Sequence, residues 1–355
     1  MRKINSLVIL TIFIMAFTLV PASVSASEKL PSITIGWTPP DTGIVWSTAT
    51  NWFEKTAKSA REAGIDVKVV AQTPSSHEAY WEQIGIIEDY LTRNVDVIAI
   101  SPTEVEVLKP VLKKANKAGV PVIVLNMLEG FEESEVEVAS YIGFDNAKTA
   151  EAAGEIALNY LQKNKSNQKK YIGLIAGIPG GFFSRTRLEA FKGIVRQDSS
   201  VEIVANCPGK WTWRGGVSCG EDILTSHPKK LDLIYGASDN MALGAAKAAK
   251  DAGRADEVAF VTQNGTWDSI KAVKEGKLVG DIWHGFPEWG HYGVKFGVML
   301  ALGLNEEVPK RHDVGAKKIT SDTVDSFYDF ENDKPDPPFK PIDWERIKEL
   351  YRQKQ

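Results

Sequence analysis

The chain has 355 residues, of which 43% are hydrophobic and 25% are charged, and its formal net charge is -4 at pH 7. This mildly acidic balance offers no basic surface for nucleic acid or for an anionic membrane, so we expect no nucleic-acid partner. Removing the first 26 of the 355 residues leaves 329, a length that favours two domains.

The N-terminus has the order of segments that is typical of a secretory signal peptide. Arg2 and Lys3 precede an uncharged apolar run at residues 7–20, and small residues follow at 22–26. The pattern predicts export and cleavage after Ala26. A membrane anchor is the alternative, but a helix of roughly 14 residues is about 21 Å long, too short for a hydrocarbon core of roughly 30 Å. No other segment approaches that length, so we expect a soluble mature protein.

The chain contains two cysteines, Cys207 and Cys219. Neither lies near the expected cleavage site, so no thiol is available there for a lipid anchor. An exported protein that diffuses freely has to be retained, which favours the periplasm over secretion to the medium. In an oxidising compartment the two cysteines are expected to form a disulfide, worth about 3 kcal/mol in the chain-entropy model. Two buried free thiols are the alternative.

Short apolar strands alternate with helices along the chain, in two successive runs. The first run has expected strands at 33–36, 67–70, 95–100 and 120–125, with helices at 47–63 and 78–92 and a third ending at 118. The second has strands at 171–176, 201–205, 231–235 and 258–262, and helices at 184–197, 215–225, 240–252 and 267–275. Such alternation indicates parallel sheets covered by helices on both faces. We therefore predict an α/β fold with two similar Rossmann-like lobes.

The sequence carries no motif of a catalytic or nucleotide-binding site. No P-loop, dinucleotide fingerprint or Gly-x-Ser-x-Gly elbow is present. The five histidines show no metal-ligand spacing, and they are His77, His227, His284, His291 and His312. The glycine-rich residues 177–181 lack the ending of a phosphate loop and are better explained as a tight turn. We expect no enzyme activity, no cofactor and no metal.

Several motifs follow one another in order between residues 33 and 320. The first half contains NVDVIAISPT at 94–103, AGVPVI at 118–123 and YIGFDN at 141–146, and the second half SDNMALGA at 238–245 and EGKL at 275–278. This succession resembles the periplasmic sugar-binding family typified by ribose-binding protein, which has the type I periplasmic binding fold. Lac-repressor-type regulators share the core, but they carry a helix-turn-helix where this chain has the expected signal peptide.

The resemblance implies two lobes joined by a three-crossing hinge, with crossings near Phe144, Phe286 and Val314. We accordingly assign 1–26 to the signal peptide, 27–144 with 286–313 to the N-terminal lobe, 145–285 with 314–330 to the C-terminal lobe, and 331–355 to a C-terminal extension. The extension contains Pro335, Pro337, Pro338 and Pro341 and an expected helix from Trp344 to Tyr351. We expect it to pack along a lobe, and contact with a partner is the alternative.

The resemblance also implies a ligand site between the lobes, at the carboxyl ends of the strands. Aromatic faces and polar groups would enclose a polar, ring-like ligand there. The ligand-binding candidates, carried over by position, are Asp41, Trp46, Asn126, Met127, Arg185, Trp211, Ser238, Asn264 and His284. Arg185 is the first choice because a guanidinium suits vicinal oxygens or a carboxylate, and a solvated helix position is its alternative. Trp211 could equally belong to the core of a lobe.

Some candidates depart from the ribose-type pattern. Asn126 and Met127 stand where that family usually has an acid followed by arginine. Asn264 replaces another acid, and Ser238 replaces an amide. Carboxylates are strong acceptors for sugar hydroxyls, so a site with Arg185 and few acids favours an anionic or oxidised sugar, or a ligand that presents acceptors. The autoinducer-2 receptor branch of the fold similarly has asparagine at the first position, and a C-terminal helical extension.

These features together predict an exported, monomeric, non-enzymatic solute-binding protein of the periplasm. Hinge closure would bury a small polar ligand, expected to be a sugar or sugar derivative, and the closed protein would deliver it to an ABC permease. The alternative is a ligand receptor for a membrane sensor kinase, similar to the autoinducer-2 receptors. The sequence does not discriminate between these two partners.

Overall fold

The computed structural model describes residues 30–165, 168–227, 230–335 and 339–355. The expected signal peptide at 1–26, and Pro337 and Pro338 of the extension, lie outside these residues. No helix in the described part of the chain is both long and apolar enough to cross a membrane. Residues 31–355 form one compact unit that contains two parallel sheets.

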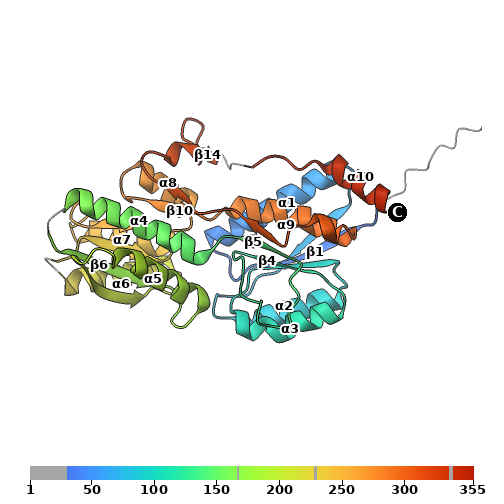
Figure 1. Ribbon diagram of the computed structural model, residues 1–355, viewed down its shortest axis with the longest axis horizontal. Coiled ribbons are helices and arrows are strands. Elements are labelled where there is room, and N and C mark those ends of the chain that lie inside the picture. The colour runs from blue at the N-terminus through green and yellow to red at the C-terminus, as the bar shows by residue number, and fades with distance from the viewer. Residues whose placement is uncertain (1–29, 166–167, 228–229, 336–338) are drawn as a thin grey trace, which may run out of the picture. The chain divides into compact units, whose positions relative to one another are not determined.

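The first sheet has six parallel strands in the order β11-β5-β4-β3-β1-β2. They are β1 (Ile33–Thr38), β2 (Val67–Ala71), β3 (Val97–Ile100), β4 (Val122–Leu125), β5 (Ser140–Gly143) and β11 (Arg311–Asp313). Helices α1 (Ile44–Glu62) and α9 (Phe286–Ala301) cover one face, and α2 (Tyr80–Thr92) and α3 (Val105–Lys117) the other (Figure 1). Every residue of β3 and β4 is buried, because central strands between two helical layers have no solvent-facing side. This sheet and its helices are called the N-terminal lobe below.

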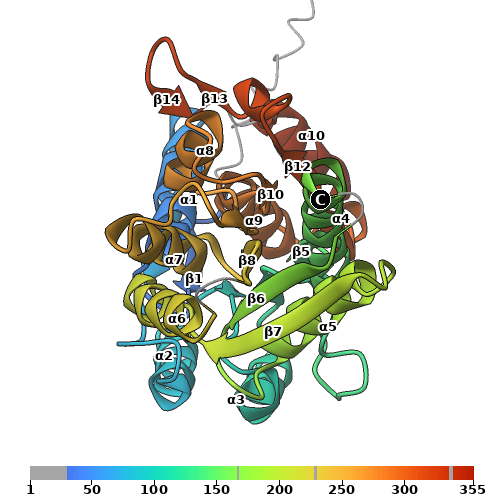
Figure 2. The ribbon, with the colours of Figure 1, turned by 90° about the vertical axis from the view of Figure 1, so that its left-hand side faces the viewer.

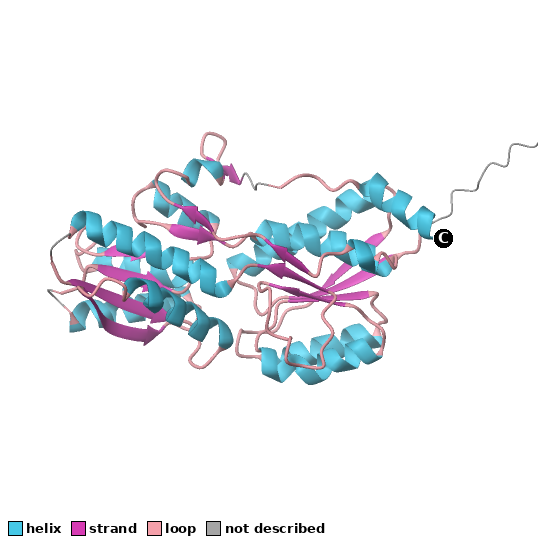
Figure 3. Cartoon of the chain, in the orientation of Figure 1, coloured by secondary structure: helices cyan, strands magenta, loops and turns pink. Residues whose placement is uncertain are grey.

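The second sheet has four parallel strands in the order β7-β6-β8-β9. They are β6 (Lys170–Ala176), β7 (Val201–Pro208), β8 (Leu233–Gly236) and β9 (Ala259–Val261). Helices α4 (Asn146–Asn164) and α5 (Phe182–Val195) lie on one side, and α6 (Trp213–Ser226) and α7 (Asp239–Asp251) on the other (Figure 2). The short α8 (Trp267–Lys274) precedes β10 (Asp281–Trp283), which pairs antiparallel with β12 (Lys317–Ile319). These elements form the C-terminal lobe, and Figure 3 shows strands between helices in both lobes.

The chain passes between the lobes at three places, which touch one another. The first follows β5 at Phe144, the second lies between β10 and α9, and the third between β11 and β12 at Val314. The Val314 backbone N–H donates to the Gly143 carbonyl (2.8 Å), and a Cβ at Gly285 would lie 3.1 Å from Val314. Gly285 has φ 71°, which glycine adopts without strain. The α/β fold is as predicted, and the lobe bounds drawn from the sequence stay a prediction.

The predicted disulfide is confirmed. Cys207, near the end of β7, is bonded to Cys219 in α6, with their Cα atoms 5.6 Å apart. The bond encloses a loop in which Lys210 and Trp211 both have positive φ, 53° and 62°. A crosslink at both ends of this loop restricts the conformations it can take, which matters because the loop forms part of the site described below.

The C-terminal extension passes from one lobe to the other (Figure 1). Near its start β14 (Lys334–Pro335) pairs with β13 (Tyr328–Asp329), which precedes the extension and whose Tyr328 belongs to the core of the C-terminal lobe. It ends in α10 (Trp344–Lys354), which packs on the N-terminal lobe. There the buried Trp344 indole N–H donates to Ser59 Oγ (2.8 Å), and Lys348 Nζ donates to the Ala63 carbonyl (2.9 Å). The expectation that the extension packs along a lobe is confirmed.

We predict that Trp344→Ala lowers the free energy of unfolding by about 3 kcal/mol, because it removes a buried aromatic side chain and its hydrogen bond. Urea denaturation followed by circular dichroism measures this change. Trp81→Ala is the matched control: the Trp81 side chain is 71% exposed, and its removal is expected to cost less than about 0.5 kcal/mol. Equal losses in the two variants would show that α10 does not stabilise the lobe.

Candidate ligand-binding site

A cavity of about 490 Å³ lies between loops of the two lobes. Its lining comes from the segments that follow β1, β2 and β4 in the N-terminal lobe and β6, β7, β8 and β9 in the C-terminal lobe, together with the first residue of α9. The carboxyl ends of parallel strands are where open α/β sheets bind ligands, and the volume suits a small molecule. The topology therefore collects side chains that are far apart in sequence around one space.

Six of the nine residues predicted from the sequence line this cavity. They are Asp41, Trp46, Asn126, Trp211, Ser238 and Asn264. The other three do not line it, and they are Met127, Arg185 and His284. Each of the three misplacements has a physical explanation.

The prediction that Arg185 reaches into the site is wrong, and Arg187 lies there instead. Arg185 is exposed, and its Nη1 donates to the Gly180 carbonyl (3.3 Å). Side chains two residues apart on a helix point about 200° apart, so Arg185 and Arg187 face opposite sides of α5. Arg187 shares the buried face with Phe183 and Phe191, each four residues away. That spacing is the sequence signal that could have identified it.

Met127 and His284 are buried rather than exposed to the cavity. Met127 has no exposed surface and lies in the core of the N-terminal lobe. The His284 ring stacks on Phe144 with their centroids 3.7 Å apart, at the hinge. Burial, and to a lesser extent the charge of Arg187, holds the pKa of His284 well below its ordinary value, so the ring is neutral.

Arg187 is a buried cation whose described partners are all neutral oxygens. Its Nε donates to Asn146 Oδ1 (3.0 Å), and its Nη1 donates to the Ala237 carbonyl (2.9 Å) and Asn264 Oδ1 (3.5 Å). No described carboxylate forms an ion pair with it, and no described residue accepts from Nη2. Burial lowers the pKa of Arg187 to about 10, so the side chain stays charged at neutral pH.

Two further polar side chains offer unpaired groups at the cavity. Ser238 Oγ is buried and has no hydrogen-bond partner among the described residues. Asn126 has φ 71°, a conformation that asparagine tolerates better than most residues. Its backbone N–H donates to the Ile142 carbonyl, while its side-chain amide bonds to no described residue. Buried polar groups are normally paired, so these groups are available to a ligand.

Aromatic rings form much of the apolar wall. Trp46, Phe183, Trp211 and Phe286 line the cavity. The Trp211 indole lies against Gly177, where a Cβ would come within 2.0 Å of the ring, so only glycine leaves room for it. Phe183 belongs to the core of the N-terminal lobe although it comes from α5, and Trp211 packs against the cores of both lobes. Trp211 is therefore both a cavity wall and a core residue.

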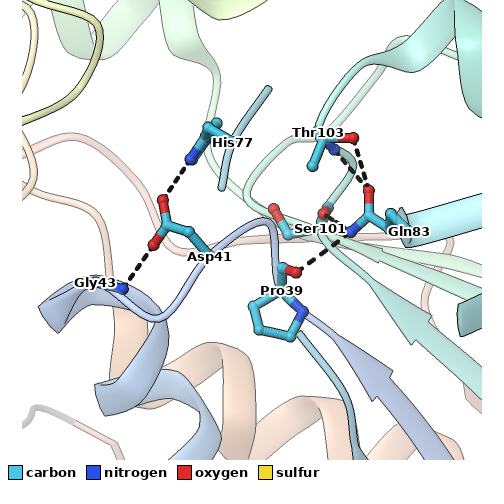
Figure 4. Close-up of polar contacts among 7 residues, drawn as sticks. All are labelled: Pro39, Asp41, Gly43, His77, Gln83, Ser101 and Thr103. Carbon is cyan, nitrogen blue, oxygen red and sulfur yellow. Dashed lines mark hydrogen bonds and ion pairs between the residues drawn. The ribbon is translucent and has the colours of Figure 1, made fainter. Parts of the chain in front are cut away.

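Two pairs of side chains lie at the cavity, one within the N-terminal lobe and one between the lobes. Figure 4 shows Asp41 between His77 and Gly43: His77 Nδ1 lies 2.5 Å from Asp41 Oδ2, and the Gly43 N–H donates to Asp41 Oδ1 (2.6 Å). Glu78 Oε1 lies 3.5 Å from Lys210 Nζ and thereby joins the two lobes. Both carboxylates that line the cavity therefore already have a partner.

Gln83 positions two loops beside the Asp41–His77 pair (Figure 4). It is fully buried, its Oε1 accepts from the Thr103 N–H and Oγ1, and its Nε2 donates to the Ser101 carbonyl (2.9 Å) and the Pro39 carbonyl (3.4 Å). It thus fastens the loop after β3 to the loop after β1. The sequence offered no signal for this residue, because a glutamine on a helix is ordinarily solvated.

A family model described as a periplasmic binding protein domain matches residues 35–305. The ribose import binding protein RbsB of Salmonella typhimurium is 29% identical over 279 residues, which cover 78% of this chain and 89% of that protein. The D-ribose/D-allose-binding protein of Pseudomonas aeruginosa is 30% identical over 226 residues, 62% of this chain and 67% of that protein.

Solved structures show the same fold. An ABC transporter periplasmic solute binding protein from Actinobacillus succinogenes, with bound D-allose, is 22% identical with a TM-score of 0.75, covering 83% of this chain and 100% of that one. A solute binding protein from Bacillus halodurans, with bound myo-inositol, is 21% identical with a TM-score of 0.73, covering 84% and 98%. The family predicted from the sequence is confirmed: the chain belongs to the periplasmic binding protein family.

Proposed function

We propose that this chain is a periplasmic solute-binding protein that captures a sugar or sugar derivative between its lobes and delivers it to an ABC transporter. The main support for the proposal is the cavity, in which unpaired polar groups from both lobes lie beside aromatic rings. Aromatic faces match the apolar faces of a sugar ring, and polar groups match its hydroxyls. The relatives described above are named as binding proteins for ribose and allose.

Binding is coupled to the hinge in this proposal. Three touching crossings join the lobes, and Glu78 of the N-terminal lobe lies 3.5 Å from Lys210 of the C-terminal lobe at the cavity. Phe183 and Trp211 of the C-terminal lobe pack against the core of the N-terminal lobe. An opening rotation would break these contacts and expose the cavity to solvent. A bound ligand that touches both lobes would favour the closed state.

We propose a monomer without catalytic activity, cofactor, metal or nucleic-acid partner, exported to the periplasm by a signal peptide cleaved after Ala26. The second candidate function is that of a receptor for a membrane sensor kinase. The observation that favours it is the extension at 331–355, which lies beyond the family match at 35–305 and places α10 on the N-terminal lobe. Ligand uptake that requires the protein would support transport, whereas a change in kinase output without uptake would support sensing.

We predict that residues 27–355, refolded to remove carried-over ligand, are stabilised by a member of a panel of sugars, sugar acids, polyols and polar amines. A ligand that binds only the folded state stabilises it by about 2.7 kcal/mol at 100 times its Kd. A thermal-shift assay measures the saturable rise in melting temperature. A panel without any saturable rise would contradict the proposed function.

We predict that Arg187→Ala weakens binding of that ligand by about tenfold or more, because Arg187 lines the cavity and no described residue accepts from its Nη2 donor. Arg185→Ala is the matched control on the same helix and is expected to leave the Kd within about twofold, because Arg185 is exposed outside the cavity. Isothermal titration calorimetry gives both constants.

The melting temperature of each ligand-free variant shows whether it is folded, and Arg187→Lys provides a charged variant should Arg187→Ala be unfolded. We expect Arg187→Lys to weaken binding as well, because an ammonium does not reproduce the planar donor geometry. A stronger loss in Arg185→Ala than in the Arg187 variants would show that the site lies elsewhere.

A further inference from the structure

We infer, on the basis of the proposed function, that the ligand is a sugar acid whose carboxylate contacts Nη2 of Arg187. Four features of the cavity lead to this substrate class: the unpaired guanidinium, the engaged carboxylates at the rim, the position of the nearest buried acid, and the neutral groups around them.

The first feature is a buried positive charge that no described carboxylate contacts. Arg187 is 4% exposed, and the described groups that accept from it are two amide oxygens and one backbone carbonyl. Buried charges in proteins are generally paired, because desolvation of an isolated ion costs far more than neutral hydrogen bonds return. A ligand that brings a negative charge to Nη2 completes this pairing, and a neutral ligand does not.

The second feature is that the carboxylates lining the cavity are already engaged. Asp41 accepts from the Gly43 N–H and lies 2.5 Å from His77, and Glu78 pairs with Lys210. Both come from the N-terminal lobe, whereas Arg187 comes from α5 of the C-terminal lobe. Neither therefore neutralises the guanidinium.

The third feature is the position of Asp239, a fully buried acid next to the site that does not line the cavity. Its Oδ1 accepts from Asn264 Nδ2 (2.9 Å) and the Asn240 N–H (2.8 Å), and its Oδ2 accepts from the Thr266 N–H (3.1 Å). Asn264 therefore stands between the acid and Arg187, with its amide oxygen toward the guanidinium. Burial raises the pKa of Asp239. Asp239 acts on Arg187 only through space, where it raises the pKa of the guanidinium, because no described hydrogen bond or ion pair joins the two side chains.

The fourth feature is the set of neutral groups that surround Arg187 in the cavity. The Ser238 hydroxyl and the Asn126 amide are neutral and unpaired, so they suit hydroxyl groups rather than a second charge. The Trp211 ring lies 5.3 Å from the Arg187 guanidinium carbon, which places an apolar ring face beside the cation. One anionic group on a polyhydroxylated ring satisfies all of these groups together.

The test compares matched acid and neutral sugars on the refolded wild-type protein by calorimetry. The pairs are D-galacturonate with D-galactose, D-glucuronate with D-glucose, and D-ribonate with D-ribose, so that uronic and aldonic acids form separate arms. For at least one pair we expect the acid to bind about tenfold or more tightly than its neutral partner. Added sodium chloride should change the affinity of the acid only slightly, because a buried ion pair is poorly screened.

Asn264→Asp tests the charge balance directly. The new carboxylate would occupy the position of an amide oxygen 3.5 Å from Arg187 Nη1, and it should weaken acid binding by about tenfold or more. Asn126→Asp is the second variant, because it adds the same charge to the cavity at a side chain with no described partner and does not disturb Asp239. Asn305→Asp is the control, since Asn305 is exposed and lies outside the cavity.

The inference is supported if the acid is preferred in wild type and in Asn305→Asp, and the preference falls in a folded cavity variant. Equal or tighter binding of the neutral sugars overturns the inference and leaves the proposed function standing. Preserved acid preference in both folded cavity variants also overturns it. Absence of binding by any sugar, acid or neutral, overturns the proposed function and the inference with it.

Discussion

A buried guanidinium has to find hydrogen-bond acceptors inside the protein, and this requirement organises the site. Arg187 takes its acceptors from Asn146 at the start of α4, from the Ala237 carbonyl after β8 and from Asn264 after β9. Asn146 also follows the first hinge crossing, and its Nδ2 donates to the Asn126 carbonyl in the N-terminal lobe (3.4 Å). One network of hydrogen bonds thus runs from the strand ends of the C-terminal lobe, through the hinge, to the other lobe. A buried network of this kind favours one arrangement of the groups it connects, while Nη2 of Arg187 is left without a described acceptor.

The loop that carries Trp211 is held by constraints that are independent of this network. The Cys207–Cys219 disulfide closes it, positive φ angles at Lys210 and Trp211 set its turn, and Gly177 leaves room for the indole. The loop therefore presents a large aromatic surface to the cavity from a fixed backbone. Because Trp211 also packs against both lobe cores, its position depends on the lobes being close together.

The sequence predicted the fold well because its signals are local. The continuous apolar runs of β3 and β4 and the alternation of strands with helices are each readable without tertiary information. Six of the residues named from the sequence line the cavity because they follow strand ends. Arg185 was named by position from the resemblance, and it lies on the exposed face of α5, opposite the buried Arg187. Its N-cap, Gly181, makes no side-chain cap bond, so the sequence carried no signal for the start of the helix, although the spacing of Phe183, Arg187 and Phe191 marks the face that it buries.

The remaining site residues could not be predicted because their roles arise only from contacts between distant segments. Gln83 connects the loops after β1 and β3 by hydrogen bonds. Phe183 comes from α5 of the C-terminal lobe but belongs to the core of the N-terminal lobe. The stacking of His284 on Phe144 likewise depends on two hinge crossings meeting. Residue type at a strand end predicts proximity to the cavity, whereas the direction of the side chain depends on packing across the lobes.

Charge selectivity and lobe closure are linked if Arg187 is the ligand anchor. In an open state water can accept from Nη2, and the guanidinium remains hydrated at little cost. Closure removes that water, so the closed state needs a replacement acceptor, and the strongest replacement is a negatively charged oxygen. A ligand without one would fill the cavity yet leave a buried cation unpaired in the closed state only, which favours opening. A ligand shifts the equilibrium between the open and closed states only by its differential affinity for them. Arg187 would then discriminate between ligands by changing the fraction of closed protein, and not by contact energy alone.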